Sequence, residues 1–157
     1  MRILGIDPGG RETGMVVVEL DGSQRRAPRV ARAVLIERGA GETEAAYVGE
    51  VVGALRELSD GCRLIAVEGL VVPTPHLRVI ALSGLLGAAV VLGAVLATAP
   101  SATVVPPGGN GSGPLRAYPG ELVGPGERAG AGWRRHLRSA WDIALAAASV
   151  ERKGAVA

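Results

Sequence analysis

The longest charge-free stretch of the chain places the strongest constraint on its fold. From Val79 to Ala99 the sequence reads VIALSGLLGAAVVLGAVLATA, without a single Asp, Glu, Lys or Arg. As an α-helix this segment would be about 31 Å long, close to the thickness of a bilayer's hydrocarbon core. It therefore has to be shielded from water, either in a membrane or within a folded domain.

The context of this segment favours a helix buried in a soluble domain. It is rich in Ala and Gly, which allow close helix–helix approach in either solvent, and it is the only such segment in the chain. It also lies between segments with the pattern of strands. We expect a buried helix that also provides a contact between two copies of the chain, and solubility without detergent would settle the membrane alternative.

The remaining pattern is that of one α/β domain. The chain has 157 residues, of which 48% are hydrophobic and 20% charged, which is enough to bury a core. Apolar runs bounded by turn residues predict strands at Arg2–Ile6, Thr13–Leu20, Val30–Glu37, Leu64–Val67 and Ala102–Val105. Helical spacing of apolar residues predicts helices at Glu42–Leu58, Val79–Ala99 and Trp133–Val150. Residues 106–132 are rich in Gly and Pro and predict a mobile loop.

Cysteine content and charge give weaker indications. Cys62 is the only cysteine, which excludes an intrachain disulfide and fits a reducing compartment. Asp7 interrupts the first apolar run, so the start of the sequence lacks a secretory pattern, and we expect a cytoplasmic location. The net charge is +2, and Lys153 is the only lysine. Arginine suits phosphate contacts, although the coding bias of a GC-rich genome explains this composition equally well.

Two acidic residues stand at the ends of apolar strands. Asp7 ends the first predicted strand in ILGIDPGGRETG, residues 3–14, and Glu68 ends another in IAVEGL, Ile65–Leu70. Each has an ordinary explanation, as a turn residue or as a strand emerging at the surface. Two carboxylates at the carboxyl ends of neighbouring strands would repel each other, and a divalent cation would relieve that repulsion.

A third group of polar residues lies on the last predicted helix. In RRHLRSAWD, residues 134–142, His136, Ser139 and Asp142 are each three residues apart. Successive members are neighbours on a helix, but the first and third lie about 120° apart around the axis and about 9 Å apart along it. By itself this motif fits an exposed helix face with a capping histidine.

Taken together, these motifs resemble the RuvC-type Holliday junction resolvases of the RNase H-like superfamily. ILGIDPGGRETG resembles the opening motif of that family, IAVEGL its second acidic motif, and HLRSAWDIALAA its C-terminal helix motif. The resemblance runs in order along essentially the whole chain, and the RSAWD form is more similar to phage-encoded members. It implies an α/β fold with a mixed five-stranded sheet flanked by helices.

The resemblance also implies a metal site. The last helix of the family carries Asp or His, followed three residues later by Asp; here His136 matches the first position and Ser139 falls at the second. Because Ser is a poor ligand for Mg²⁺, we predict that Asp142 takes its place, unless the alignment is off by three residues. The implied catalytic and metal-binding residues are Asp7, Glu68, His136 and Asp142. They would hold two Mg²⁺ or Mn²⁺ ions about 3.5–4 Å apart.

The implied function is metal-dependent resolution of four-way DNA junctions. A homodimer, with helix 79–99 as its candidate contact, would make paired symmetric nicks. The family's aromatic residue after the second acid is missing from Leu70–His76, as is its lysine-rich stretch. Arginines are the candidate DNA contacts in their place: Arg11, Arg78, Arg116, Arg128, Arg134, Arg135 and Arg138.

Other functions stay open at this stage. A nuclease acting on flaps and other branched DNA would keep the metal site and lose the junction selectivity. A DNA-binding module that has lost an acid on the last helix would not cleave at all. DPGGRETG is also similar to the first phosphate loop of actin-like sugar kinases, but 157 residues leave no room for the two domains that those proteins need.

Overall fold

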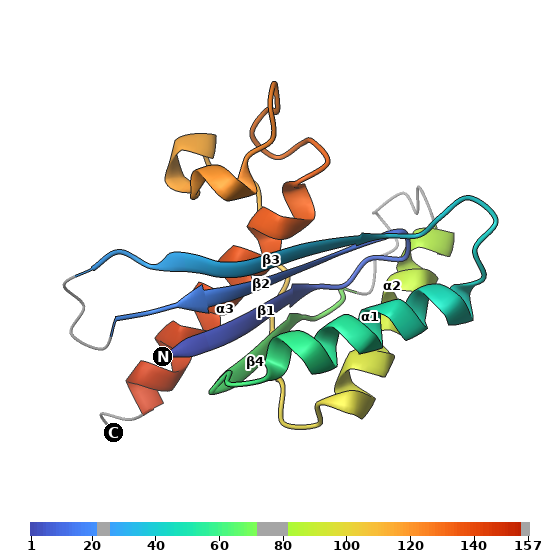
Figure 1. Cartoon of the computed structure of the whole chain (residues 1–157), viewed down its shortest axis with the longest axis horizontal. Helices are drawn as coiled ribbons and strands as arrows, with labels where there is room; N and C mark the ends of the chain where they lie inside the picture. Colours follow the sequence, from blue (N-terminus) through green and yellow to red (C-terminus); the bar gives the residue numbers. More distant parts are fainter. Residues whose placement is uncertain (22–25, 72–81, 155–157) are drawn as a thin grey trace.

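The computed structural model describes residues 1–21, 26–71 and 82–154, and its strands form one five-stranded sheet. The order across the sheet is β3-β2-β1-β4-β5 (Figure 1). Strands β1, β2 and β3 are antiparallel neighbours, whereas β4 is parallel to β1 and β5 is parallel to β4. The strands are β1 (Arg2–Asp7), β2 (Glu12–Glu19), β3 (Arg29–Glu37), β4 (Leu64–Glu68) and β5 (Thr103–Val105). The mixed five-stranded sheet expected from the sequence is confirmed.

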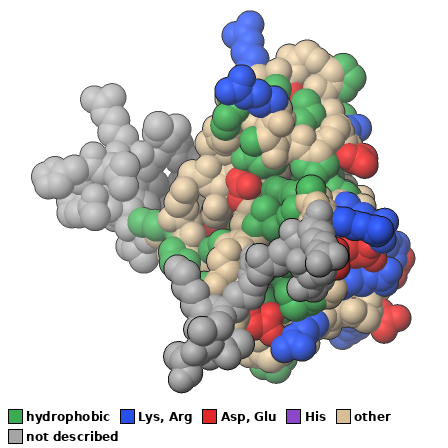
Figure 2. Space-filling view, turned by 90° about the vertical axis from the view of Figure 1, so that its left-hand side faces the viewer, with side chains coloured by type: hydrophobic (Ala, Val, Ile, Leu, Met, Phe, Trp, Pro, Cys, Tyr) green, Lys and Arg blue, Asp and Glu red, His purple; other side chains and the backbone are tan. Residues whose placement is uncertain are grey.

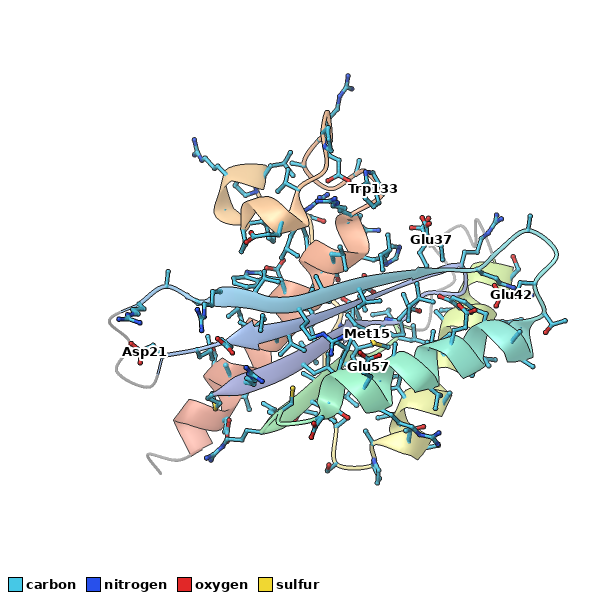
Figure 3. All side chains as sticks on the ribbon, viewed as in Figure 1. Met15, Asp21, Glu37, Glu42, Glu57 and Trp133 are labelled. Carbon is cyan, nitrogen blue, oxygen red and sulfur yellow. The ribbon has the colours of Figure 1, made fainter. Side chains whose placement is uncertain are left out.

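Helices cover both faces of this sheet. Helices α1 (Glu44–Ser59) and α2 (Leu82–Thr98) lie on one face, and α3 (Arg135–Gly154) crosses the other (Figure 1). Alternation along β1 supplies both cores: Leu4 and Ile6 pack with α1 and α2, while Ile3 packs with α3. Met15 lies between the sheet and α1 (Figure 3).

The charge-free segment forms a helix that is buried along one side. Val91 and Val95 of α2 are buried against the sheet and α1. On the other side Leu86 is 57% exposed and Val90 is 48% exposed, so the expected burial is seen for one face, and the contact between two copies of the chain stays a prediction. The first three residues of the predicted helix, 79–81, lie outside the described residues. In the described parts of the chain, no helix has the length and hydrophobicity needed to cross a membrane.

The Gly/Pro-rich segment 106–132 packs against α3. It contains two short 3₁₀ helices, η1 (Leu115–Ala117) and η2 (Gly120–Leu122), and it buries Tyr118 and Leu122 against that helix. The segment is a loop, as the sequence predicts, but with defined internal contacts. Its mobility stays a prediction.

A buried ion pair organises the second half of this segment. The guanidinium of Arg138, on α3, is fully buried and donates to the Glu127 carboxylate and to the carbonyl of Ala131 (2.7 Å). The Glu127 side chain is 3% exposed and accepts from the backbone N–H groups of Gly124 (2.9 Å) and Arg134 (2.7 Å). Figure 3 shows Trp133 where this segment leads into α3.

The end of the sheet at which β1 begins has ion pairs on its exposed surface. Arg2 lies 2.8 Å from Glu19, and Arg63 lies 2.8 Å from Glu151. Figure 2 shows this end of the molecule, with basic side chains interspersed with Asp and Glu along one side. Pairs of this kind contribute little to stability because solvent screens them.

We predict that Glu127→Gln lowers the free energy of unfolding by about 3–5 kcal/mol, because the Arg138 charge stays buried without its partner. Urea denaturation at pH 7 measures this. The exposed acid nearby supplies the control, since Glu121→Gln should change the value by less than about 0.5 kcal/mol. Equal stability of the two variants would contradict a structural role for the pair.

The same pair predicts a pH dependence. Burial alone would raise the pKa of Glu127, but the N–H groups of Arg134 and Gly124 and the Arg138 charge outweigh it and hold the pKa below 4.5. The stability contributed by this carboxylate is therefore present above pH 4.5 and is lost as the pH falls through the lowered pKa. As the pH is lowered from 4.5 through the pKa of Glu127, the difference in unfolding free energy between the native chain and Glu127→Gln should therefore shrink.

Candidate active site

Two carboxylates lie together at one edge of the sheet. β1 and β4 are parallel neighbours with Ile6 opposite Val67, so that Asp7 and Glu68 follow at the same end of the two strands. Asp7 is buried and Glu68 is half-buried. Burial raises the pKa of Glu68; a hydrogen bond from Asn110 opposes this, and the neighbouring Asp7 carboxyl raises the pKa further. The two acidic residues that end apolar strands in the sequence therefore lie on neighbouring strands at the same edge of the sheet.

A histidine from α3 joins them. His136 Nδ1 lies 2.8 Å from Asp7 Oδ2, and His136 Nε2 lies 3.5 Å from Glu12 Oε2. Burial disfavours the charged imidazolium, but the hydrogen bond and charge of Asp7, together with the charge of Glu12, raise the pKa of His136 overall. Residues more than 60 positions apart in the sequence thus form one cluster of a carboxylate pair and an imidazole.

Glycines in the strands bring α3 close enough for this contact. A Cβ at Gly14 would lie 2.2 Å from the backbone oxygen of His136, and a Cβ at Gly5 would lie 1.9 Å from that of Ala140. Real Cβ atoms do not approach backbone oxygens so closely, so any other residue would push α3 away from the sheet. Gly14 is also the β2 partner of Asp7, which places the His136 backbone directly beside the acid.

The turn after Asp7 is fixed by hydrogen bonds to side chains on β2 and α1. Thr13 is fully buried, and its Oγ1 lies 2.7 Å from the hydroxyl oxygen of Tyr47, on α1. The Tyr47 hydroxyl donates to the carbonyl of Gly9 at 3.0 Å. These bonds fix the DPGG turn. Tyr47 could not be found from the sequence, because its position in the chain gives no sign that it reaches this turn.

Asp142 has other partners. Its Oδ2 accepts hydrogen bonds from the Gly111 N–H and from the Tyr118 hydroxyl, each at 2.8 Å. Ser139, one turn earlier, is buried at 2% exposure. In the structure, His136 is therefore hydrogen-bonded to Asp7, whereas Asp142 is hydrogen-bonded to Gly111 and Tyr118. A role for Asp142 as a metal ligand stays a prediction.

Asn110 belongs to the site although the sequence analysis does not select it. Its Nδ2 donates to Glu68 Oε1 at 2.6 Å. The only local signal is an Asn-Gly pair within a Gly-rich segment, which indicates a turn and not a site.

The chemistry of these residues suits one divalent cation. In the described ranges, no three His, Cys, Asp or Glu side chains are grouped closely enough to hold a metal ion as they stand. Asp7, Glu68 and His136 nevertheless offer the oxygen and nitrogen donors that Mg²⁺ and Mn²⁺ accept, and a cation would relieve the repulsion between the two neighbouring acids. A second cation would need donors beyond these three residues.

The arginines predicted to contact DNA differ in how far their side chains are exposed. Exposed side chains that remain available for phosphate are Arg11, Arg116, Arg128 and Arg135. The charge of Arg135 acts on both Glu68 and His136, so it lies beside the acidic cluster. Arg134 is half-buried, stacks on the Trp133 ring at 4.5 Å and donates to backbone oxygens.

For Arg138 the expectation of a DNA contact is wrong. Its guanidinium is fully buried, and it is bonded to Glu127 and to backbone oxygens within the segment 106–132. Burial and the ion pair leave it no access to phosphate. Arg78 lies outside the described residues, as does most of the segment Leu70–His76.

Comparison with solved structures identifies the fold. The structure of Thermus thermophilus RuvC matches with a TM-score of 0.67 at 23% identity, covering 98% of this chain and 97% of that one. T. thermophilus RuvC in complex with a Holliday junction substrate matches with the same TM-score and coverage at 21% identity. The Fowlpox virus resolvase in complex with substrate Holliday junction DNA has a TM-score of 0.53 at 9% identity, over 94% and 96% of the two chains.

These similarities establish the RNase H-like α/β fold of RuvC for this chain. No family model matches the sequence, and no curated protein matches it either. The similarity to phage-encoded members therefore stays a prediction.

We predict that Gly14→Ala destabilises the protein by about 1–3 kcal/mol or more, because the new methyl group collides with the His136 backbone. Gly53→Ala is the matched control: Gly53 lies on α1 with no atom within 4 Å of an added Cβ, and the change should stabilise by about 0.5–1 kcal/mol. Urea denaturation compares the two variants. If Gly14→Ala is as stable as the native chain, the close approach of α3 is not a constraint.

Proposed function

We propose that this protein is a metal-dependent endonuclease that resolves four-way DNA junctions by paired symmetric nicks. The observation that carries the proposal is the cluster of Asp7, Glu68 and His136, brought together from β1, β4 and α3. The same arrangement of elements is shared with two resolvases whose structures contain Holliday junction DNA, over at least 94% of this chain.

Each residue of the cluster has a distinct role in this proposal. The carboxylates of Asp7 and Glu68 bind divalent cation, and the exposed guanidinium of Arg135 beside them meets a phosphate of the DNA backbone. His136, held by Asp7, orients the attacking water and accepts its proton. When bound, Mg²⁺ or Mn²⁺ would lower the pKa of that water and would stabilise the negative charge on the leaving oxygen. Binding of two ions, with Asp142 as the further ligand, stays a prediction.

A DNA-binding module without cleavage activity is the second candidate. The observation that favours it is Ser139, which occupies the position at which the resemblance implies an acid, together with the partners that Asp142 already has. A nuclease acting on any branched DNA is a variant of the first candidate and differs from it only in substrate range.

The exposed side of α2 supports a dimer. Leu86 and Val90 are large apolar side chains on one face of that helix, and at 57% and 48% exposure they are left largely uncovered by the described residues. A second copy related by two-fold symmetry would bury them and would give each protomer an equivalent strand of a symmetric junction.

We predict that Asp7→Asn abolishes cleavage of a synthetic four-way junction and leaves junction binding intact, because it removes one of the two acids and keeps the side-chain shape. Gel assays with Mg²⁺, with EDTA, and on linear and flap substrates measure this. Glu50→Gln, an exposed acid on α1, is the matched control and should cleave normally. Cleavage that persists in Asp7→Asn would contradict the proposal, and tight binding without any cleavage by the native chain would favour the binding module.

We further predict that Leu86→Asp shifts the protein from dimer to monomer in sedimentation equilibrium, because a charge in the centre of an apolar contact is costly to bury. Val150→Asp is the control: Val150 is 64% exposed on α3, away from the proposed contact, and its substitution should leave the assembly unchanged. A native chain that is monomeric at every concentration would rule out this dimer.

A further inference from the structure

Asn110 is held against Glu68 by a short turn of the segment 106–132. The Ser112 N–H donates to the Gly109 carbonyl at 3.1 Å, which closes a turn with Asn110 and Gly111 at its centre. Gly111 has a φ of 73°, a conformation that favours glycine at the third position of a turn. The turn directs the Asn110 amide to Glu68 Oε1, at 2.6 Å.

This turn lies directly on α3 at Ser139. A Cβ at Gly111 would lie 2.7 Å from the Arg135 oxygen, 2.9 Å from the Ser139 nitrogen and 3.2 Å from Ser139 Cβ. The small side chain at position 139 therefore leaves room for the turn. At the position where the resemblance implies an acid on the helix, this chain has a serine with a turn packed over it.

Asp142 holds the turn in place. Its Oδ2 accepts from the Gly111 N–H and from the Tyr118 hydroxyl, and the same hydroxyl accepts from the Gly113 N–H at 3.0 Å. One carboxylate oxygen and one phenol thus fix both ends of the stretch 111–113. Through Gly111 they also fix Asn110, the neighbouring residue.

We propose that Asn110 and Asp142 are positioning residues for the Glu68 carboxylate, with Asp142 acting through the turn and not as a metal ligand. The Asn110 amide donates to Glu68 Oε1 at 2.6 Å and so keeps the Glu68 carboxylate in one orientation. This inference rests on the proposed function, in which Asp7 and Glu68 bind divalent cation. Loss of hydrogen-bonding partners behind a ligand typically weakens metal affinity by about 10- to 100-fold.

Calorimetric titration with Mn²⁺ alone, without DNA, tests the proposal, and thermal unfolding of each variant confirms that it folds. Asn110→Ala and Asp142→Ala should each weaken Mn²⁺ affinity at least about tenfold. The double variant should be no weaker than Asn110→Ala, because both changes remove the same bond to Glu68. Glu50→Gln, with its acid on the exposed side of α1, should bind as the native chain does.

Asp142→Asn separates positioning from metal ligation. The amide oxygen of an asparagine accepts the same two hydrogen bonds, so Mn²⁺ affinity should stay within about threefold of the native value if Asp142 holds the turn. If Asp142→Asn is as weak as Asp142→Ala, the charge itself binds metal and the proposal is overturned. An unchanged affinity of Asn110→Ala also overturns it, and that variant decides the question if Asp142→Ala does not fold.

Asp7→Asn distinguishes the failure of this inference from the failure of the proposed function. If Asp7→Asn abolishes Mn²⁺ binding while Asn110→Ala and Asp142→Ala bind normally, only the positioning roles are wrong. If the native chain does not bind Mn²⁺ at all, the proposed function and this inference are both overturned.

Discussion

The close contact between α3 and the backbone of β1 and β2 determines the rest of the structure. It depends on two positions without a side chain, Gly5 and Gly14, where any Cβ would overlap backbone oxygens of the helix. Because α3 lies directly on the strands, His136 reaches an acid that belongs to the first strand of the chain. The opposite face of the sheet has larger side chains and two helices, and from there the Tyr47 hydroxyl of α1 bonds the Gly9 carbonyl while Gly87 of α2 packs against Gly10.

The two neighbouring acids, Asp7 and Glu68, lower the stability of the folded chain, and the fold nevertheless holds them together. Two carboxylates at adjacent strand ends raise each other's charging energy, and burial adds to that, which is visible in the raised pKa of Glu68. A core built for stability alone would place neutral side chains there. The surrounding glycines, the Thr13–Tyr47 contact and the Asn110 amide restrict this edge of the sheet to one arrangement, so the repulsion is retained and not relieved by rearrangement.

The sequence predicts those parts of the fold that short-range patterns encode. Apolar runs ended by Asp7 and Glu68 locate β1 and β4, and helical spacing locates α1 and α3 to within a few residues. The sequence predicts a loop at 106–132 but not the contacts within it, because they depend on the ion pair between Glu127 and Arg138, which no local pattern reveals. For the same reason the sequence predicts a DNA contact for Arg138: an arginine in a basic run has the same sequence signal whether it is exposed or buried.

Helix geometry explains why the last motif could not be assigned from spacing. His136, Ser139 and Asp142 lie within the first two turns of α3, and each step of three residues rotates the side chain by about 60° around the axis. His136 therefore faces the strand ends, while Asp142, two steps on, faces the segment 111–118. A single cation cannot bridge residues that diverge in this way unless another element spans the gap. In this chain the element over Ser139 is the turn that carries Asn110, so the polar group that reaches Glu68 from this side comes from a loop and not from α3.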